Sequence, residues 1–193
     1  MSDSSQLPSQ TDEQLMLAFS KGVTPAFDQL FLRYGQSIFA FFRRRASDLP
    51  RAEELTQETF IALFRAAPRY KPEALFRSYL FAIAFRILRA DRRKQTFRAF
   101  FFGPATNTEK AVAAGKNNDE ILWLRQALNR LDRGDREILL LREFEQLSYS
   151  EIAGLLKLPL NTVRSRLFRA RLALRECLDP SPSKDSVALG ELS

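Results

Sequence analysis

The sequence predicts an all-α protein, with two small helical modules joined by a flexible linker and a helix-turn-helix in the second module. Apolar residues recur with helical spacing over most of the 193 residues, and no segment alternates apolar and polar residues as a half-buried strand would. Prolines and capping residues divide this pattern into pieces of helical length. The pattern then fails around Gly103-Pro104, where small and polar residues follow, which is typical of a linker.

These changes in pattern predict five segments along the chain. The last of them is set by Pro180 and Pro182, which follow the end of the helical periodicity. We expect a disordered N-terminus at 1–10, a first helical module at 11–96, a linker at 97–118, a second helical module at 119–178 and a disordered tail at 179–193.

Three helices are expected in the first module. The first starts at Thr24-Pro25, with Thr24 as its cap and the proline at the first helical position, where an amide hydrogen is not needed. The second opens at Pro50 and is broken by Pro68. The third runs from about 73 to about 96. Their apolar faces are expected to be formed by Phe27, Leu30, Phe31, Tyr34, Ile38 and Phe41; by Leu55, Thr59, Ala62, Leu63 and Ala66; and by Phe76, Leu80, Ile83 and Ile87.

The second module is expected to contain a helix-turn-helix. Ser148 and Glu151 have the spacing of a capping box, so a helix should start directly after Ser148. Pro159 should stop that helix, because proline has no amide hydrogen to continue it. Asn161 or Thr162 can then cap the next helix by accepting a bond from a free backbone amide.

The second of these helices has one apolar face and one basic face. The apolar stripe is expected to consist of Val163, Leu167, Ala170, Leu174 and Leu178. The residues that lie off this stripe and face solvent or a ligand are Arg164, Ser165, Arg166 and Arg169. A solvated basic face is common in ordinary helices. The arginines here cluster near the N-terminal end, however, which is the end that a DNA-reading helix inserts into the major groove.

The charge of the chain favours a polyanionic partner. Lysines and arginines number 30 and acidic residues 23, for a net charge of +7. Ten basic and only two acidic residues lie between 65 and 98, where they alternate with aromatic residues. Such a mixture suits single-stranded nucleic acid, because bases stack on rings while cations follow the phosphates. Core packing is the competing interpretation, and it is preferred for Phe81 and Ile83.

Several functions are disfavoured by composition. The chain has no histidine and a single cysteine, Cys177, so a zinc site, a histidine base and an internal disulfide are not expected. No signal peptide is expected, and the longest strongly apolar window, 79–85, is too short to span a bilayer. We therefore expect a cytoplasmic protein with no membrane insertion, no metal and no cofactor.

The chain resembles the extracytoplasmic-function (ECF) class of bacterial sigma factors over about residues 12–178. Residues 52–64, AEELTQETFIALF, are similar to the family's second-region helix, which contacts the clamp helices of the polymerase β′ subunit. Residues 76–94, FRSYLFAIAFRILRADRRK, resemble the stretch that opens and reads the minus-ten element. Residues 128–176, with the strings SYSEIA and TVRSRLFRAR, resemble the fourth region, which reads the minus-thirty-five element.

This resemblance implies a promoter-specificity subunit with no catalytic residues of its own. The implied partners are RNA polymerase core (through the β′ clamp helices and the β flap), promoter DNA as duplex and as melted strand, and an anti-sigma factor. The minus-thirty-five contacts would be Asn161, Thr162, Arg164, Ser165, Arg166 and Arg169. The minus-ten contacts would be Phe76, Tyr79, Arg86, Arg92, Arg93 and Lys94. The core-binding residues would be Glu54, Gln57, Glu58 and an exposed Phe60.

The chain also departs from the family pattern. Tyr79 stands where the family usually has tryptophan, Arg86 where it has asparagine, and Ala90 where it has an aspartate, with Asp91 one position later. The minus-ten sequence is therefore not predicted. The cluster at 100–102, three consecutive phenylalanines, is also unusual, and two roles are open for it: packing back on the first module or inserting into the polymerase.

Three other functions remain as alternatives. A stand-alone helix-turn-helix regulator would need a dimerisation helix or a sensor domain, and the sequence suggests neither. A helical adaptor or anti-sigma factor fits poorly with the net charge of +7. An enzyme acting on nucleic acid would need clustered carboxylates for metal ions, whereas the acidic residues here are scattered or lie at helix starts.

Overall fold

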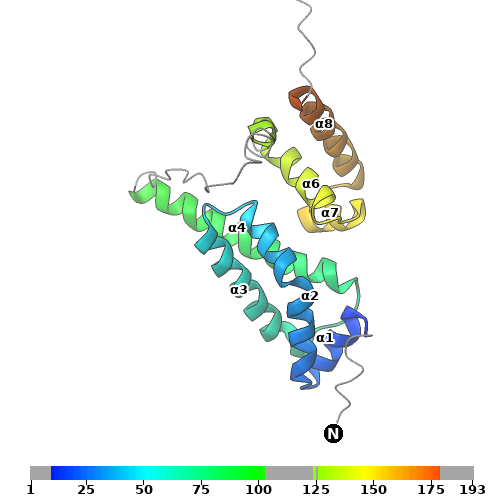
Figure 1. Ribbon diagram of the computed structural model, residues 1–193. Helices are drawn as coiled ribbons and strands as arrows, with labels where there is room; N and C mark the ends of the chain where they lie inside the picture. The colour runs from blue at the N-terminus through cyan, green and yellow to red at the C-terminus, as the bar shows by residue number, and fades with distance from the viewer. Residues whose placement is uncertain (1–9, 103–123, 125, 179–193) are drawn as a thin grey trace, which may run out of the picture. The chain divides into compact units, whose positions relative to one another are not determined.

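The computed structural model describes residues 10–102, 124 and 126–178, which belong to two separate helical units (Figure 1). Helices are the only regular secondary structure among these residues, which confirms the predicted all-α class. None of the described helices is long and apolar enough to cross a bilayer. The expected tails and most of the expected linker lie outside the described residues.

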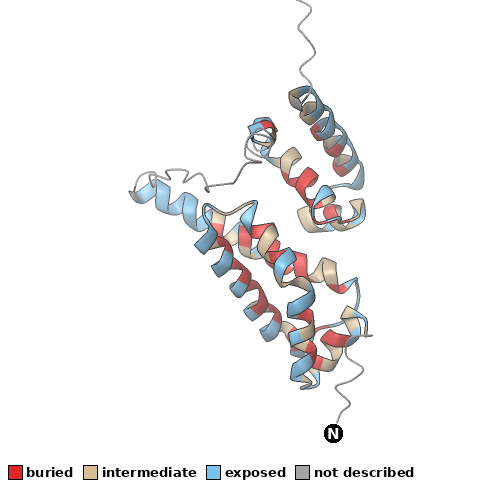
Figure 2. Cartoon of the chain, viewed as in Figure 1, coloured by how far each residue is buried: buried red, intermediate tan, exposed pale blue. Residues whose placement is uncertain are grey.

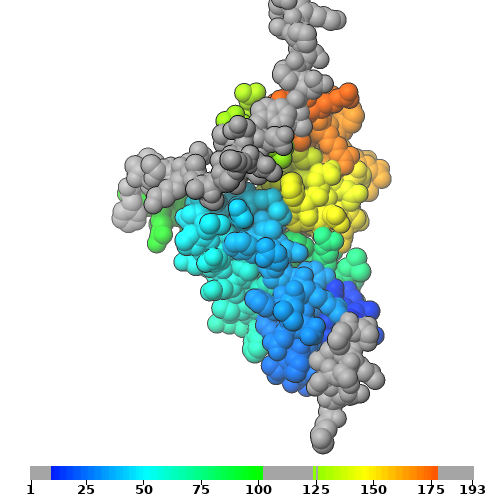
Figure 3. All heavy atoms as spheres, in the orientation of Figure 1, coloured from blue at the N-terminus to red at the C-terminus, as the bar shows by residue number. Residues whose placement is uncertain are grey.

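The N-terminal unit is a bundle in which consecutive helices pack on each other. Its elements are α1 (Asp12–Ser20), α2 (Thr24–Arg43), α3 (Leu49–Ala66), a single 3₁₀ turn η2 (Ala67–Arg69) and α4 (Phe76–Phe102). Helix α1 packs on α2, α2 on α3, and α3 on α4. Figure 3 shows the atoms of α2 and α3 in continuous contact on one face of this unit.

The helix starts agree only partly with the sequence prediction. Helix α1 was not predicted, although Thr11 and Gln14 form a complete capping box. Thr24 is the first residue of α2 and not its cap; the cap position is held by Val23, whose side chain cannot accept a hydrogen bond. Helix α3 is capped by Asp48 and begins at Leu49, one position before the predicted start at Pro50.

The core of this unit is apolar and aromatic (Figure 2). Its largest fully buried side chains are Leu15, Met16, Leu30, Ile38, Phe41, Phe42, Leu55, Leu63, Phe76, Leu80, Phe81 and Leu88. Ile83 is also buried, so the core interpretation of Phe81 and Ile83 is confirmed. Phe31, predicted on the inner face of α2, is instead half exposed, because it lies at the edge of the stripe with its ring against Phe60.

Helix α4 differs from its predicted bounds at both ends. It begins at Phe76, where the backbone amide donates a hydrogen bond of 2.8 Å to the Glu13 carboxylate of α1. It continues through Phe102 instead of ending near Thr96. No glycine or proline lies between these residues, so nothing stops the helix before Gly103-Pro104. Residues 97–102 are therefore helical and do not belong to the linker.

The C-terminal unit contains the predicted helix-turn-helix. Residues 126–130 are helical, and α6 (Arg133–Glu143), α7 (Tyr149–Leu156) and α8 (Leu160–Leu178) follow. Both α6 and α7 pack on α8. The capping box of Ser148 and Glu151 is complete, which confirms the predicted start of α7.

The turn between α7 and α8 differs in detail from the prediction. Helix α7 ends at Leu156, and its C-cap residue Lys157 adopts the left-handed conformation (φ 55°) that commonly closes a helix. Helix α8 begins before Asn161 and Thr162, and the Pro159 carbonyl accepts the first helical hydrogen bond from Val163. Asn161 and Thr162 therefore lie in the first turn of α8 and neither is its cap.

Candidate functional site

The recognition helix α8 has the two faces that its sequence predicts. Val163, Leu167 and Ala170 are buried against the rest of the unit, and Leu174 is partly buried. On the other side, the exposed residues of the first three turns include Asn161, Arg164, Ser165 and Arg169, while Thr162 and Arg166 are half-buried. The predicted minus-thirty-five residues thus form one basic surface at the N-terminal end of α8.

A carboxylate of α6 lies beside this surface. Asp135, in the first turn of α6, has only 13% of its side chain exposed. Its two oxygens lie 3.9 Å from Nε of Arg166 and 3.5 Å from Nε of Arg169. A β-carbon at the neighbouring Gly134 would overlap Nη1 of Arg166. The sequence analysis missed both residues, since only the packing of α6 on α8 brings them to the arginines.

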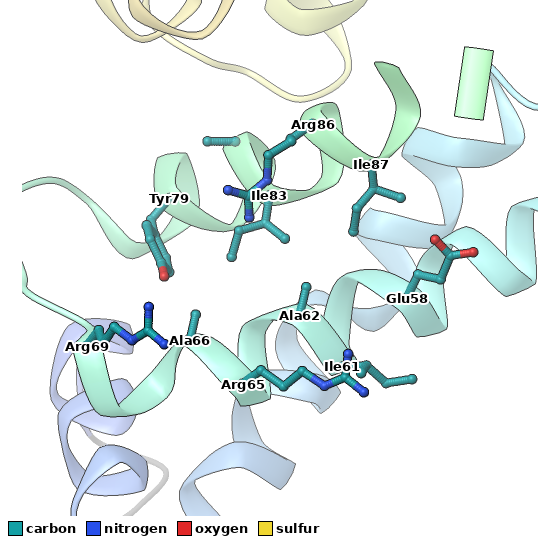
Figure 4. Close-up of a pocket in the computed structure, with 11 residues that line it drawn as sticks. Glu58, Ile61, Ala62, Arg65, Ala66, Arg69, Tyr79, Ile83, Arg86 and Ile87 are labelled. Atoms are coloured by element: carbon teal, nitrogen blue, oxygen red, sulfur yellow. The ribbon is translucent and has the colours of Figure 1, made fainter. Parts of the chain in front are cut away.

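A second basic site lies in an open groove between α3 and α4 (Figure 4). The groove has a volume of about 810 Å³. Tyr79 and Arg86 point into it from α4. Arg69, the last residue of η2, points toward Tyr79. Arg65 adds a third guanidinium, and Glu58 is the one carboxylate among the lining residues. Arg65 and Arg69 were not predicted as site residues, although both belong to the basic stretch that the sequence shows.

The ring of Tyr79 is supported from behind by Tyr70. The two ring centroids are 5.2 Å apart. Burial, together with the negative charge of Glu13, raises the pKa of Tyr70 to about 12, so its hydroxyl stays neutral at physiological pH. Tyr70 therefore packs against Tyr79, which lines the groove, as a neutral ring.

Two of the predicted contact residues are buried, and those assignments need correction. Phe76 has no exposed surface and packs against the rings of Tyr34 and Tyr70, so in this structure it is a core residue and offers no surface to DNA. Phe60 is only 5% exposed and packs against Phe27 and Phe31, so it is not the exposed core-binding residue that was expected. Helical periodicity had already placed Phe76 on the apolar face of its helix, and only the family resemblance suggested a contact role for it.

The remaining residues predicted to contact the minus-ten element lie further along α4. Arg93 and Lys94 are exposed, and Arg92 is half-buried. Arg93 is seven residues after Arg86, so the two side chains lie within about 20° of each other around the helix. The groove and Arg93 therefore share one side of α4.

The exposed face of α3 carries the predicted polymerase contacts. Glu54, Gln57 and Glu58 are exposed, and Glu54 lies three residues before Gln57 and four before Glu58, so it shares a face with both. The exposed apolar residues beside them are Ile61 and Phe64, and not Phe60. Ile61 could have been predicted, because it lies four residues after Gln57 and three after Glu58.

Arg51 ties this face to α4. Its guanidinium contacts Glu54 at 2.5 Å, Glu58 at 3.6 Å and the buried Asp91 of α4 at 2.7 Å. Partial burial would lower the pKa of Arg51, but its hydrogen bonds to Glu54 and Asp91 outweigh this effect and raise it. Asp91 also accepts a hydrogen bond from Gln95 at 2.8 Å. Asp91 is therefore a structural link between two helices, and it does not face the groove.

We expect the replacement Asp91→Asn to destabilise the N-terminal unit by about 2 kcal/mol. Breaking a buried ion pair commonly costs about 3–5 kcal/mol, but Arg51 keeps Glu54 as a partner and is partly exposed, so the loss should be smaller. Chemical denaturation followed by circular dichroism measures it. The matched variant Glu54→Gln removes the exposed partner of the same arginine and should cost under about 1 kcal/mol. Equal losses for the two variants would contradict a structural role for Asp91.

Comparisons with known proteins agree with this geometry. The Sigma-70 region 2 family model matches residues 30–102, and the Sigma-70 region 4 model matches residues 121–174. The chain is 31% identical over 187 residues to the RNA polymerase sigma-H factor of Pseudomonas aeruginosa, covering 90% of this chain and 97% of that protein. It is 31% identical over 185 residues to the ECF RNA polymerase sigma-E factor of Escherichia coli K12, covering 88% and 95%. The solved structure of CnrH in complex with the cytosolic domain of CnrY is similar with a TM-score of 0.68 and 26% identity, covering 89% of this chain and 99% of that one.

Proposed function

The chain belongs to the ECF class of RNA polymerase sigma factors, and from this premise we propose which of its surfaces carry out each step of promoter recognition. As a sigma factor it binds RNA polymerase core and directs promoter-specific initiation. It is a transcription initiation factor and not a catalytic enzyme.

The basic surface of α8 reads the minus-thirty-five element. The observation that supports this most strongly is that Arg164, Ser165 and Arg169 are exposed on the N-terminal half of a helix whose opposite side is fully packed. An arginine fork matches O6 and N7 of guanine in the major groove. Exposed hydroxyl groups and further arginines supply phosphate contacts, which fix the position of the helix on the duplex.

The groove between α3 and α4 receives the melted minus-ten strand. Tyr79 offers an aromatic face for a base, and Arg65, Arg69 and Arg86 supply the positive charge that phosphates require. The departures at Tyr79 and Arg86 from the family pattern both line this groove, and a tyrosine–arginine pair recognises a base differently from tryptophan and asparagine. We therefore expect the minus-ten preference of this chain to differ from that of family members that carry the usual pair.

The exposed face of α3 binds polymerase core, with Gln57 and Ile61 at its centre. We expect the double variant Gln57→Ala/Ile61→Ala to weaken core binding by about 1–2 kcal/mol, or about 5- to 30-fold, because it truncates a polar and an apolar contact on one interface. A titration of labelled protein with core polymerase measures the change. Leu32→Ala, which truncates an exposed apolar residue on α2, should have no effect. Wild-type affinity of the double variant would exclude this face.

A protein inhibitor is expected to cover these same surfaces. CnrH, the relative of similar fold, was solved in complex with the cytosolic domain of CnrY. We infer that an anti-sigma factor holds this chain inactive by competing for the α3 face and the basic surfaces. Such an inhibitor should contact Gln57 and Ile61 directly. The double variant Gln57→Ala/Ile61→Ala should therefore also bind the inhibitor more weakly.

The test of the proposed function is reconstituted transcription. The purified chain is added to core polymerase with a genomic promoter library, and new start sites are mapped. The proposal is supported if the new start sites are preceded by one common pair of minus-ten and minus-thirty-five sequences. Binding to duplex DNA without polymerase, and no new initiation with it, would favour the alternative of a stand-alone helix-turn-helix regulator.

A further inference from the structure

The last three turns of α4 carry an exposed aromatic cluster, Phe97, Phe100 and Phe101. Their side chains are 62%, 83% and 61% exposed, which makes Phe100 the most exposed large apolar residue that the structure describes. The ring of Phe101 lies 4.5 Å from that of Phe97 and 5.3 Å from that of Phe100, measured between centroids. In Figure 2 these turns of α4 are coloured as exposed throughout. Phe100 and Phe101 therefore do not pack back on the N-terminal unit.

The cluster lies on the same side of α4 as the groove. Tyr79, Arg86, Arg93 and Phe100 are spaced by seven residues, and each step of seven turns the direction by only about 20°. Phe97 lies five complete turns after Tyr79 and points the same way. One face of α4 thus presents a tyrosine, two arginines and then the phenylalanines over about 31 Å.

The charge around the cluster selects the kind of partner. The segment from 92 to 102 contains four basic residues and no acidic residue, and Arg93, Lys94 and Arg98 are exposed. A surface that binds an apolar protein face would gain little from such a positive charge. Exposed rings between exposed cations are instead the arrangement by which proteins bind unpaired nucleic-acid strands.

We propose that Phe97, Phe100 and Phe101 form a stacking platform for unpaired bases of the melted promoter strand, which extends the minus-ten surface to the C-terminal end of α4. This inference rests on the proposed minus-ten function of Tyr79 and Arg86. The cations at Arg93 and Lys94 hold the phosphates between Tyr79 and the cluster, and Arg98 supplies a further cation within the cluster. The ligand is single-stranded DNA, and the rings contribute affinity with little base preference, because every base has an aromatic face.

Two triple variants separate stacking from general apolar contact. Replacing the three phenylalanines with leucine keeps the apolar surface and removes the rings, whereas replacing them with tyrosine keeps the rings. Each full-length variant is bound to core polymerase, and its affinity is measured for a forked promoter DNA in which the minus-ten strand is unpaired. We expect the leucine variant to lose about tenfold in affinity, as for the loss of one base–aromatic stack, and the tyrosine variant to lose less than about twofold.

Two further DNA substrates test the ligand. On a fork whose unpaired nucleotides lack bases, the wild type should bind no better than the leucine variant. On fully duplex DNA carrying only the minus-thirty-five element, all variants should bind equally. Wild-type affinity of the leucine variant on the fork would overturn the proposal, as would an equal loss on duplex DNA. Reduced binding of the leucine variant to core polymerase without DNA would point to a protein partner and also overturn it.

Arg86→Ala, measured on the same fork, tests the proposed minus-ten function separately. If Arg86→Ala binds the fork as the wild type does, the minus-ten assignment itself fails. If Arg86→Ala loses affinity while the leucine variant does not, only the stacking platform fails.

Discussion

Replacing Phe60 with alanine is expected to destabilise the N-terminal unit by about 3 kcal/mol, at the lower end of the range for buried phenylalanines. Phe60 is 5% exposed, and its ring lies 4.8 Å from that of Phe31 and 6.3 Å from that of Phe27. Because Phe31 is itself half exposed, the space left by the missing ring can partly close. The midpoint of thermal unfolding, followed by circular dichroism, should fall by more than about 10 °C.

The same variant should lose core binding only indirectly. The loss should appear at temperatures where the N-terminal unit unfolds and should disappear on cooling. Ile61→Ala, one position further along α3, is the matched control: it should leave the stability within about 0.5 kcal/mol of the wild type, as is usual for exposed sites. If Phe60→Ala kept full stability and still failed to bind core at low temperature, Phe60 would be a contact residue as the sequence suggested.

The contrast between Phe60 and the helix-turn-helix shows what the sequence can predict. The start of α7 was predicted correctly because the capping box of Ser148 and Glu151 is a local hydrogen-bond pattern of four residues. The stripe of α8 was predicted because Val163, Leu167 and Ala170 recur at helical spacing and most residues between them are arginine or serine. In α3, by contrast, Phe60 and Ile61 are both apolar and adjacent. Periodicity alone cannot decide which of the two faces the core.

The contacts of two acidic residues, Asp91 and Asp135, were not predicted for a different reason. Asp91 meets Arg51 across 40 residues of sequence, and Asp135 meets Arg169 across 34. Such pairs depend on how two helices pack, and a single sequence contains no local pattern that reports it. The family resemblance drew attention to Asp91 as a displaced site residue. Asp91 is instead buried between α3 and α4, where it pairs with Arg51 and links the two helices.

The recognition helix supports the last prediction, in which its three arginines have different roles. The exposed side chain of Arg169 points away from the buried stripe, so we assign it to a base contact. Arg169→Ala should weaken binding to the preferred minus-thirty-five sequence by about 1–3 kcal/mol and relax the base preference at one or two positions. Arg164→Ala and Arg166→Ala should weaken binding to all sequences alike and lower the salt dependence by about one unit each. A randomised minus-thirty-five library, bound with core polymerase at two salt concentrations, measures both effects.

Variants on α6 then test whether Asp135 positions these arginines. Asp135→Asn removes the carboxylate that lies near Nε of both Arg166 and Arg169, so it should raise affinity for unrelated sequences while lowering discrimination at the base pairs read by Arg169. Gly134→Ala displaces the guanidinium of Arg166 and keeps its charge, so it should change all sequences equally. A selective loss for Arg166→Ala with a uniform loss for Arg169→Ala would reverse the two roles. Unchanged binding in all three arginine variants would exclude α8 as the element that reads the promoter.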